Sequence, residues 1–279
     1  RPLHIALSEW AEILVVAPLS ASSLARWANG SAEGLLASIL LAFEKPVVAA
    51  AAMNTGMWNN PFVQKNWQTL NNFPKVLPLS PESGLLACDR VGEGRMANPD
   101  LIRLAISSAL LQKGTTGELK RDWKNKNFLV TAGPTSEAID PARVLTNRSS
   151  GRMGVLLAQA ARLRGAEVNL VHGPIQVPAS WLEGLSTYSV SSSAEMQSNL
   201  ARLQPSADVI AMTAAIADLR KAKGAASQKL SKEVLISSIG NDFEQVPDLL
   251  AELVSRRKEG QLILGFSALT GDDQKIKEQ

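Results

Sequence analysis

The sequence has little cysteine, no long apolar run and no excess of one charge sign. Cys88 is the single cysteine among 279 residues, which excludes an intrachain disulfide framework and fits a reducing cytoplasm. The longest apolar run, residues 35–43, is too short to span a bilayer, so we expect no membrane association. The net charge is only +3 and both signs are interspersed, so the sequence has no basic segment typical of a nucleic-acid-binding surface.

The length allows one large or two medium cores, and two are the more natural division of a chain with 45% hydrophobic residues. Residues 112–126 (QKGTTGELKRDWKNK) are charged, contain Gly and Thr and lack an apolar stripe, which is typical of a linker. We therefore predict two α/β units, 1–111 and 127–279. Because the sequence begins at Arg1 and stops within a charged helical pattern at Gln279, we expect a fragment that lacks both ends.

The second unit opens with a β-α-β pattern. The periodicity predicts a strand over 127–131, a helix over 154–163 and a strand over 166–171. Residues 146–154 (TNRSSGRMG) lie between the first strand and the helix. A Gly-containing turn before a helix exposes amide N–H groups, and the helix dipole favours negative charge there. We interpret this segment as a binding loop for a nucleotide or another anion.

Side chains in the loop are consistent with this interpretation. Ser149 and Ser150 can add hydroxyl donors, and Arg148 and Arg152 can offset phosphate charge. The alternative is a capped helix start with two solvated arginines. The loop departs from the GxGxxG spacing, so it does not predict ordinary NAD binding.

The first unit alternates in the same α/β manner. Strands are predicted over 12–17 and 46–52, and helices over 20–29 and 35–42. In an open parallel sheet, the carboxyl ends of the strands share one crevice. We expect the ligand of this unit to bind there.

Polar residues follow both predicted strands. Ser20, Ser22 and Ser23 come after the first strand, in a segment of small residues that lets a flat or phosphorylated ligand approach the backbone. Asn54 follows the second strand, where its amide can hydrogen-bond a substrate carboxylate or carbonyl. A serine helix cap and a turn-forming asparagine are the alternatives.

Two further residues could carry chemistry. His4 lies just before a predicted helix over 5–12, where a neutral imidazole can serve as acid or base; the alternative is a surface histidine without a role. Cys88 lies in a Gly-bearing segment, 87–96, that could carry a thiol over a site as a lid. The alternative is an inert small hydrophobe.

Taken together, these motifs resemble the bifunctional phosphopantothenoylcysteine decarboxylase / phosphopantothenate–cysteine ligase family of coenzyme A biosynthesis. The similarity covers essentially the whole chain in order, and eight motifs in sequence are highly specific. The segments are HIALSEW (4–10), APLSASSLARWANG (17–30), AAMNTGMW (51–58), ACDRVGEGRM (87–96), TAGPTSEAIDPARVLTNRSSGRMG (131–154), TAAIADLR (213–220), QKLSK (228–232) and ILGFSA (263–268).

For the first unit, the resemblance implies a flavodoxin-like three-layer domain that binds FMN and oxidises the substrate's cysteinyl thiol, after which carbon dioxide leaves. His4 matches the family's active-site histidine, and Asn54 the asparagine that contacts the substrate carboxylate. Cys88 matches the cysteine of the substrate clamp. Flavin-contacting positions fall on Ser20, Ser22, Ser23 and Met53. Relatives that bind flavin form trimer-based homo-oligomers, so we expect one here.

For the second unit, the resemblance implies a Rossmann-like ligase domain that uses CTP and Mg²⁺ to join 4'-phosphopantothenate and cysteine through an acyl-cytidylate. Asn147 matches the asparagine that holds this intermediate, and Lys229 the lysine that meets the triphosphate. Asp218 and Phe266 match nucleotide-pocket positions. Further nucleotide-contacting positions fall on Gly133, Ser149, Ser150, Gly151, Ala214 and Lys232. No metal ligands are assigned, and the choice between CTP and ATP stays open.

The sequence departs from the family at several places. The usual PAMN reads AAMN at 51–54, which loses a proline that stiffens the turn. The clamp usually reads CGD, where this chain has CDR at 88–90. Residues 241–247 (NDFEQVP) read as an insertion. The family's N-terminal Gly-rich flavin phosphate loop and its C-terminal lysines are absent from this sequence.

Two other functions remain open at this stage. One is a non-catalytic, flavodoxin-like regulatory subunit, which the joint presence of His4, Asn54 and Cys88 disfavours. The other is a flavin-dependent decarboxylase of peptidyl cysteines, which would not need residues 127–279. The ligase motifs therefore count against it.

Overall fold

A computed structural model of the protein describes residues 1–86, 90–112 and 119–268. Cys88 and residues 113–118 of the predicted linker lie outside the described residues. Contacts divide the chain into two compact units. The first comprises Arg1–Lys124, Gln159–Ala166 and Pro178–Glu183; the second comprises Asn125–Ala158, Glu167–Val177 and Gly184–Gln279. The assignment of a decarboxylase domain to 1–111 and a ligase domain to 127–279 stays a prediction.

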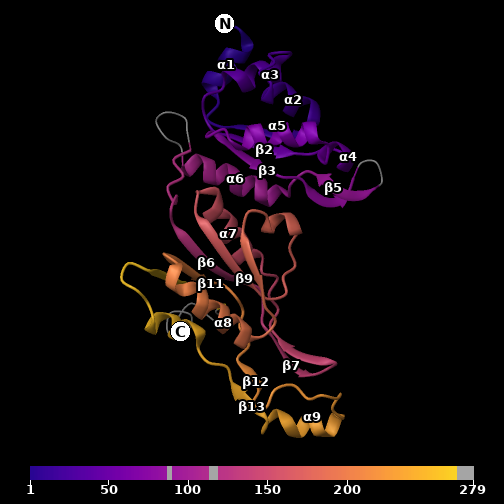
Figure 1. The fold of residues 1–279 in the computed structure, drawn as a ribbon, viewed down its shortest axis with the longest axis vertical. Coiled ribbons are helices and arrows are strands. Elements are labelled where there is room, and N and C mark those ends of the chain that lie inside the picture. The colour runs from indigo at the N-terminus through magenta and orange to yellow at the C-terminus, as the bar shows by residue number, and fades with distance from the viewer. Residues whose placement is uncertain (87–89, 113–118, 269–279) are drawn as a thin grey trace, which may run out of the picture. The chain divides into compact units, whose positions relative to one another are not determined.

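The first unit is an α/β structure with a three-stranded parallel sheet of order β1-β2-β3. The middle strand is buried along its whole length. Figure 1 shows α5 on one side of β2 and β3 and α6 on the other. The elements are α1 (Leu3–Trp10), β1 (Leu14–Leu19), α2 (Ala21–Ala28), α3 (Leu35–Ala42), β2 (Val47–Ala51), α4 (Thr55–Trp58), α5 (Pro61–Asn71), β3 (Val76–Leu79), β4 (Glu82–Leu85), β5 (Val91–Arg95) and α6 (Pro99–Leu111).

Two sequence predictions in this unit need correction. Helix α1 begins at Leu3, because the Pro2 carbonyl accepts the first helical hydrogen bonds from Ile5 and Ala6, so His4 lies inside the helix and not before it. Strand β1 begins at Leu14, two residues later than predicted. The Leu14 amide donates to the carbonyl of Pro46, directly before β2, and this is the first hydrogen bond of the strand to its neighbour. Both elements also end two residues away from their predicted ends, α1 at Trp10 and β1 at Leu19, whereas the predicted boundaries of α2, α3 and β2 agree within one residue.

The predicted linker is partly packed. Gln112 and Leu119 are buried, and Gln112 Nε2 donates to the carbonyl of Leu163 at 3.0 Å within the first unit. The charged sequence of the segment did not predict these contacts, because one buried glutamine and one buried leucine do not produce a periodic apolar pattern.

The second unit is built on a five-stranded parallel sheet of order β10-β9-β6-β11-β14. Two antiparallel pairs, β7-β8 and β12-β13, extend from it (Figure 1). The elements of residues 125–268 are β6 (Asn127–Ala132), β7 (Ser136–Asp140), β8 (Arg143–Thr146), α7 (Arg152–Leu163), β9 (Glu167–His172), η1 (Ala179–Leu182), β10 (Ser186–Ser189), α8 (Ser193–Leu203), η2 (Gln204–Ser206), β11 (Val209–Met212), β12 (Leu219–Lys221), α9 (Lys232–Ile239), β13 (Phe243–Gln245), α10 (Leu249–Ser255) and β14 (Leu262–Gly265).

The strand order explains where a ligand can bind. The order reverses between β6 and β11, the first and fourth strands of this sheet along the chain. In an open α/β sheet such a reversal leaves a crevice beyond the carboxyl ends of the two strands. The predicted β-α-β unit is confirmed as β6, α7 and β9.

Candidate functional site

Two loops meet at this reversal point. The loop after β6 bonds to the loop after β11 through Ala215 N to Gly133 O at 2.9 Å and Thr135 N to Ala215 O at 3.1 Å. The hydroxyl of Thr135 also accepts from Ala217 N at 2.9 Å. The backbone of the second loop is therefore fixed before any ligand arrives.

Thr131, which the sequence analysis did not single out, orients the same loop. Its side chain is buried at the end of β6, and its Oγ1 accepts from the amides of Thr213 and Ala214, both at 3.0 Å. The Thr213 hydroxyl in turn donates to the carbonyl of Thr131. The only sequence signal was a threonine at the carboxyl end of an otherwise apolar strand.

Asn147 lies beside the second loop. Its Nδ2 donates to the carbonyl of Ile216 at 3.0 Å. Residue 147 directly follows β8, so the β7-β8 hairpin sets its position. An amide in this place offers both a donor and an acceptor to a ligand.

The hydroxyls of the two serines that follow Asn147 and Arg148 accept hydrogen bonds from backbone amides at the start of α7. Ser149 Oγ accepts from Gly151 N and Ser150 Oγ from Arg152 N, both at 3.4 Å. These contacts match the alternative of a capped helix, since they satisfy the first amide of α7 and the amide just before it. Contact of Ser149, Ser150 and Gly151 with a nucleotide stays a prediction.

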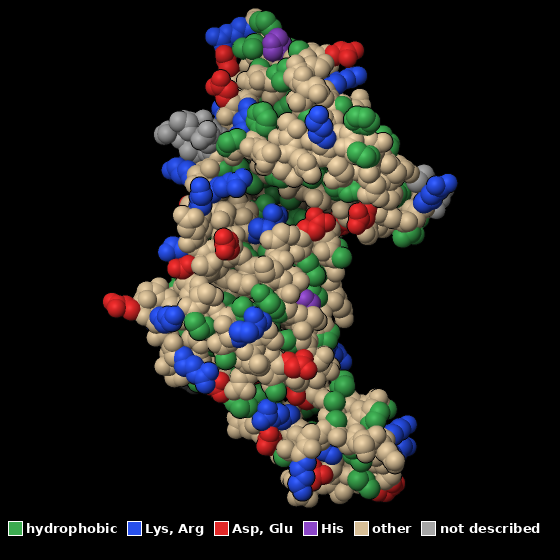
Figure 2. Space-filling view, viewed as in Figure 1, with side chains coloured by type: hydrophobic (Ala, Val, Ile, Leu, Met, Phe, Trp, Pro, Cys, Tyr) green, Lys and Arg blue, Asp and Glu red, His purple; other side chains and the backbone are tan. Residues whose placement is uncertain are grey.

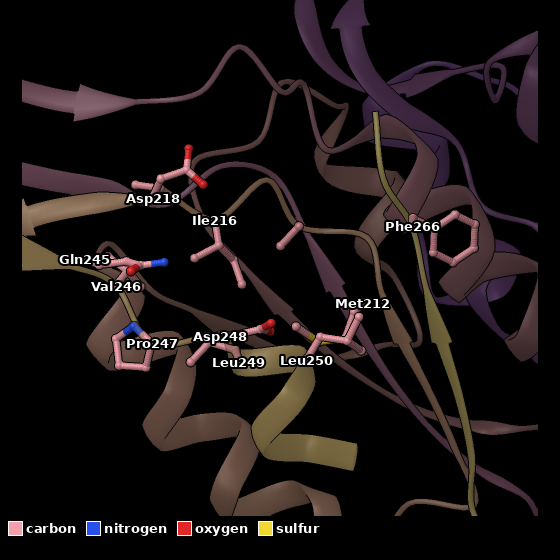
Figure 3. Close-up of a pocket in the computed structure, with 12 residues that line it drawn as sticks. Met212, Ile216, Asp218, Gln245, Val246, Pro247, Asp248, Leu249, Leu250 and Phe266 are labelled. Atoms are coloured by element: carbon pink, nitrogen blue, oxygen red, sulfur yellow. The ribbon is translucent and has the colours of Figure 1, made fainter. Parts of the chain in front are cut away.

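A cavity of about 280 Å³ opens beyond β11 and β14. Three predicted residues, Ala214, Asp218 and Phe266, line it. Figure 3 shows Asp218 and Gln245 on one side of the cavity and Phe266 on the other. Met212, Ile216, Ala217 and residues 245–250 complete the lining.

Residues 245–250 were missed as a site because 241–247 read as an insertion. The amide of Val246 donates to Asp218 O at 2.8 Å, and the Asp248 side chain caps α10 by accepting from Ala251 N at 2.9 Å. An aspartate directly before an apolar helical run was the available signal.

The two predicted lysines lie apart from the lining. Lys229 is exposed in the segment before α9, and Lys232 is the exposed first residue of that helix. Asp140, at the end of β7, lies beside this segment and accepts from the amide of Leu230 at 3.2 Å.

Asp140 is ionised far below neutral pH. Burial alone raises the pKa of this carboxyl, but hydrogen bonds from Arg143 and from the amides of Ala142 and Leu230 outweigh burial and lower it from 3.8 to about 2. A carboxyl with a lowered pKa stabilises the fold above its unfolded-state pKa, and this contribution disappears as the pH falls through the folded value.

Asp140→Asn is therefore expected to be less stable than the wild type above a pH of about 3.8, and the difference should vanish as the pH falls toward about 2. Urea unfolding of both proteins at several pH values measures it. A difference that stays constant over this range would contradict the assigned ionisation.

The first unit has its own cavity, of about 390 Å³, at the carboxyl ends of β1 and β2. Two predicted residues, Met53 and Asn54, line it, and Asn54 Oδ1 also accepts from Gly56 N at 2.8 Å as the cap of α4. The remaining lining residues are Pro18, Ala52, Leu85, Leu86, Gly94, Arg95 and Met96. The mostly apolar walls fit a flat aromatic ring such as that of a flavin.

The other predicted residues of this unit that the structure describes, Ser20, Ser22, Ser23 and His4, are not among the residues that line the cavity. Ser20 caps α2, since its Oγ accepts from Ser23 N at 3.3 Å, and Ser22 is exposed. His4 is half-buried in α1. For Ser20 the observed contact is the helix cap that was the alternative, while contact of Ser20, Ser22 and Ser23 with a cofactor stays a prediction.

The face drawn in Figure 2 shows no region of one charge sign, and the described residues form no group of metal ligands. Figure 2 shows basic and acidic side chains interspersed over the visible face. Within residues 1–86, 90–112 and 119–268, no three His, Cys, Asp or Glu side chains group as a metal site would require. No helix in the same ranges combines the length and the apolar character needed to cross a membrane.

Comparison with known families identifies the chain. Residues 123–279 match the model of the DNA/pantothenate metabolism flavoprotein C-terminal domain. The chain belongs to this family. Residues 1–110 match the Flavoprotein family model. Both matches confirm the resemblance carried by the eight motifs and the α/β class of both units.

The chain is similar to bifunctional proteins over nearly its whole length. Coenzyme A biosynthesis bifunctional protein CoaBC of Bacillus subtilis is 35% identical over 271 residues, covering 96% of this chain and 64% of the relative. Its namesake in Mycobacterium bovis is 38% identical over 281 residues, with the same coverage. A structure of the C-terminal domain of a CoaBC protein shares 34% identity over 55% of this chain and 69% of that chain, with a TM-score of 0.44. The chain thus spans 64% of the length of these curated relatives.

Proposed function

We propose that this protein, at its full length, catalyses two successive steps of coenzyme A biosynthesis. The second unit condenses 4'-phosphopantothenate with cysteine at the expense of CTP, and the first unit decarboxylates the resulting 4'-phosphopantothenoylcysteine to 4'-phosphopantetheine. The observation that supports this most is the cavity beyond β11 and β14 of the second sheet. Three residues that the resemblance assigns to the nucleotide, Ala214, Asp218 and Phe266, line this one cavity.

The ligase step begins when the carboxylate of phosphopantothenate attacks the α-phosphate of CTP and pyrophosphate leaves. The amine of cysteine then attacks the acyl carbon, and CMP leaves. Asn147, held by the carbonyl of Ile216, would hold the acyl-cytidylate between these steps. Lys229 would offset the charge that develops on pyrophosphate. A divalent cation such as Mg²⁺ would accompany CTP, with ligands that stay unassigned.

The decarboxylation would take place in the first unit. Bound FMN would supply the electron acceptor for the cysteinyl thiol. Asn54, which lines the apolar cavity, would orient the substrate carboxylate. Apolar walls solvate a carboxylate poorly, which favours its departure as neutral carbon dioxide.

The purified full-length protein is expected to carry flavin absorbance and to release pyrophosphate only when CTP, 4'-phosphopantothenate and cysteine are all present. Carbon dioxide should follow pyrophosphate, because the ligase product is the decarboxylase substrate. Omission of cysteine is the matched control for carbon dioxide release. A colourless preparation without CTP-dependent pyrophosphate release would refute the proposal.

A further inference from the structure

The segment that carries Lys229 is tied to the β7-β8 hairpin. The amide of Leu230 donates to Asp140 Oδ2 at 3.2 Å, and the carbonyl of Leu230 accepts from Arg143 Nη2 at 2.6 Å. Earlier in the segment, the amide of Ala226 donates to the carbonyl of Ile139 at 3.0 Å. The hairpin therefore holds both backbone polar groups of the residue next to Lys229.

Asp140 and Arg143 are themselves held in place. The side chain of Asp140 has no exposed surface, whereas that of Arg143 is 27% exposed. The carboxylate accepts from Ala142 N at 2.8 Å and from Arg143 Nε at 2.9 Å in addition to Leu230. A buried carboxylate with this many donors has one orientation, because any rotation would leave charge unpaired.

The tether acts directly on the backbone of Lys229. The amide that Asp140 binds belongs to the planar peptide group that also contains the carbonyl of Lys229. Fixing this plane fixes the Cα from which the lysine side chain starts, since successive Cα atoms are about 3.8 Å apart. The exposed side chain of Lys229 thus starts from a Cα whose following peptide group is held by the hairpin.

We propose that Asp140, with Arg143, is the positioning residue for Lys229, holding the lysine backbone so that its ammonium meets the triphosphate of CTP. The inference rests on the proposed ligase function. The same hairpin carries Asn147 at its other end, so one β-ribbon would set the positions of both groups that the proposed ligase reaction uses. Asp140 touches no reacting atom in this arrangement.

A double-mutant cycle in the full-length protein tests this role. Asp140→Ala is expected to lower kcat/KM for CTP in pyrophosphate release by about 30-fold when Lys229 is present, within the range of coupling between residues that act together. In the Lys229→Ala background the same change is expected to cost less than about 2-fold. A structural role alone would give equal costs in the two backgrounds, and that result would overturn the proposal.

Asp208→Ala is the matched control. Asp208 also accepts a backbone amide, from Asn127 at 2.7 Å, and pairs with Lys126 at 3.6 Å, but it lies at the amino ends of β6 and β11. Its replacement should have the same effect on kcat/KM with or without Lys229.

Hydrogen exchange gives a second readout that needs no activity. The amide of Leu230 should exchange at least about 10-fold faster in Asp140→Ala, since its acceptor is lost, while the amide of Ala251, bound to Asp248, stays unchanged. If Asp140→Ala fails to fold, Asp140→Asn replaces it and should shift both readouts in the same direction. Unchanged exchange at Leu230 would overturn the tether.

The two possible failures are distinguishable. A wild-type protein without CTP-dependent pyrophosphate release overturns the proposed function and this inference with it. A wild-type protein that releases pyrophosphate, but shows equal costs of Asp140→Ala in both backgrounds, overturns the positioning role alone.

Discussion

Asn147→Asp is expected to lower CTP-dependent ligation by about 100-fold or more, as does the loss of one oriented hydrogen-bond donor in other acyl-transfer sites. The substitution removes the Nδ2 donor and sets a carboxylate oxygen against the carbonyl of Ile216, 3.0 Å from the present nitrogen. The added negative charge would also repel the phosphate of an acyl-cytidylate. Decarboxylation of supplied 4'-phosphopantothenoylcysteine should continue, because Asn147 belongs to the second unit. Both activities are measured on one preparation.

Asn199→Asp is the matched control for this change. Asn199 Nδ2 also donates to a backbone carbonyl, that of Glu195 at 3.0 Å, but it is half-buried on α8 and does not line the cavity. Its replacement should leave both activities within about 2-fold, as for most surface substitutions. Loss of both activities in a folded, flavin-bound Asn147→Asp protein would count against two separate sites.

Gly154→Ala is expected to destabilise the second unit by about 2 kcal/mol and to impair ligation. A Cβ at this position would lie 2.7 Å from both the carbonyl of Thr131 and the Cβ of Ala132, and would collide with the Thr213 hydroxyl. Alanine favours a helix over glycine by about 1 kcal/mol. The steric cost exceeds this gain, because the added Cβ meets a backbone carbonyl, the Cβ of Ala132 and a hydroxyl already bonded to Thr131, and none of these is the end of a flexible side chain.

The effect of Gly154→Ala is measured as the urea concentration at which amides of β6 and β11 lose protection from hydrogen exchange. Gly240→Ala serves as control, since nothing lies within 4 Å of a Cβ at that position. A Gly154→Ala protein as stable as the wild type would show that α7 can move away from the sheet without cost.

The predictability of the site differs between its residues. Asn147, Asp218 and Phe266 were predicted from motifs, since each lies in a short segment whose residue types are distinctive. Thr131 and Asp140 were not found, because their roles depend on partners more than 80 residues away along the chain. Hydrogen bonds between such distant segments leave no local pattern.

By itself, the sequence determined the α/β class, the β-α-β unit around 146–154 and the order of motifs that places the chain in its family. Those features are local, because periodicity, turn residues and helix caps each depend on a window of about 15 residues. Only the tertiary structure decided that residues 245–250 face Phe266 across one cavity and that Asp140 holds the segment of Lys229. The order of the strands and the pairing of buried polar groups set these contacts. Both bring distant segments together, and no short stretch of sequence encodes them.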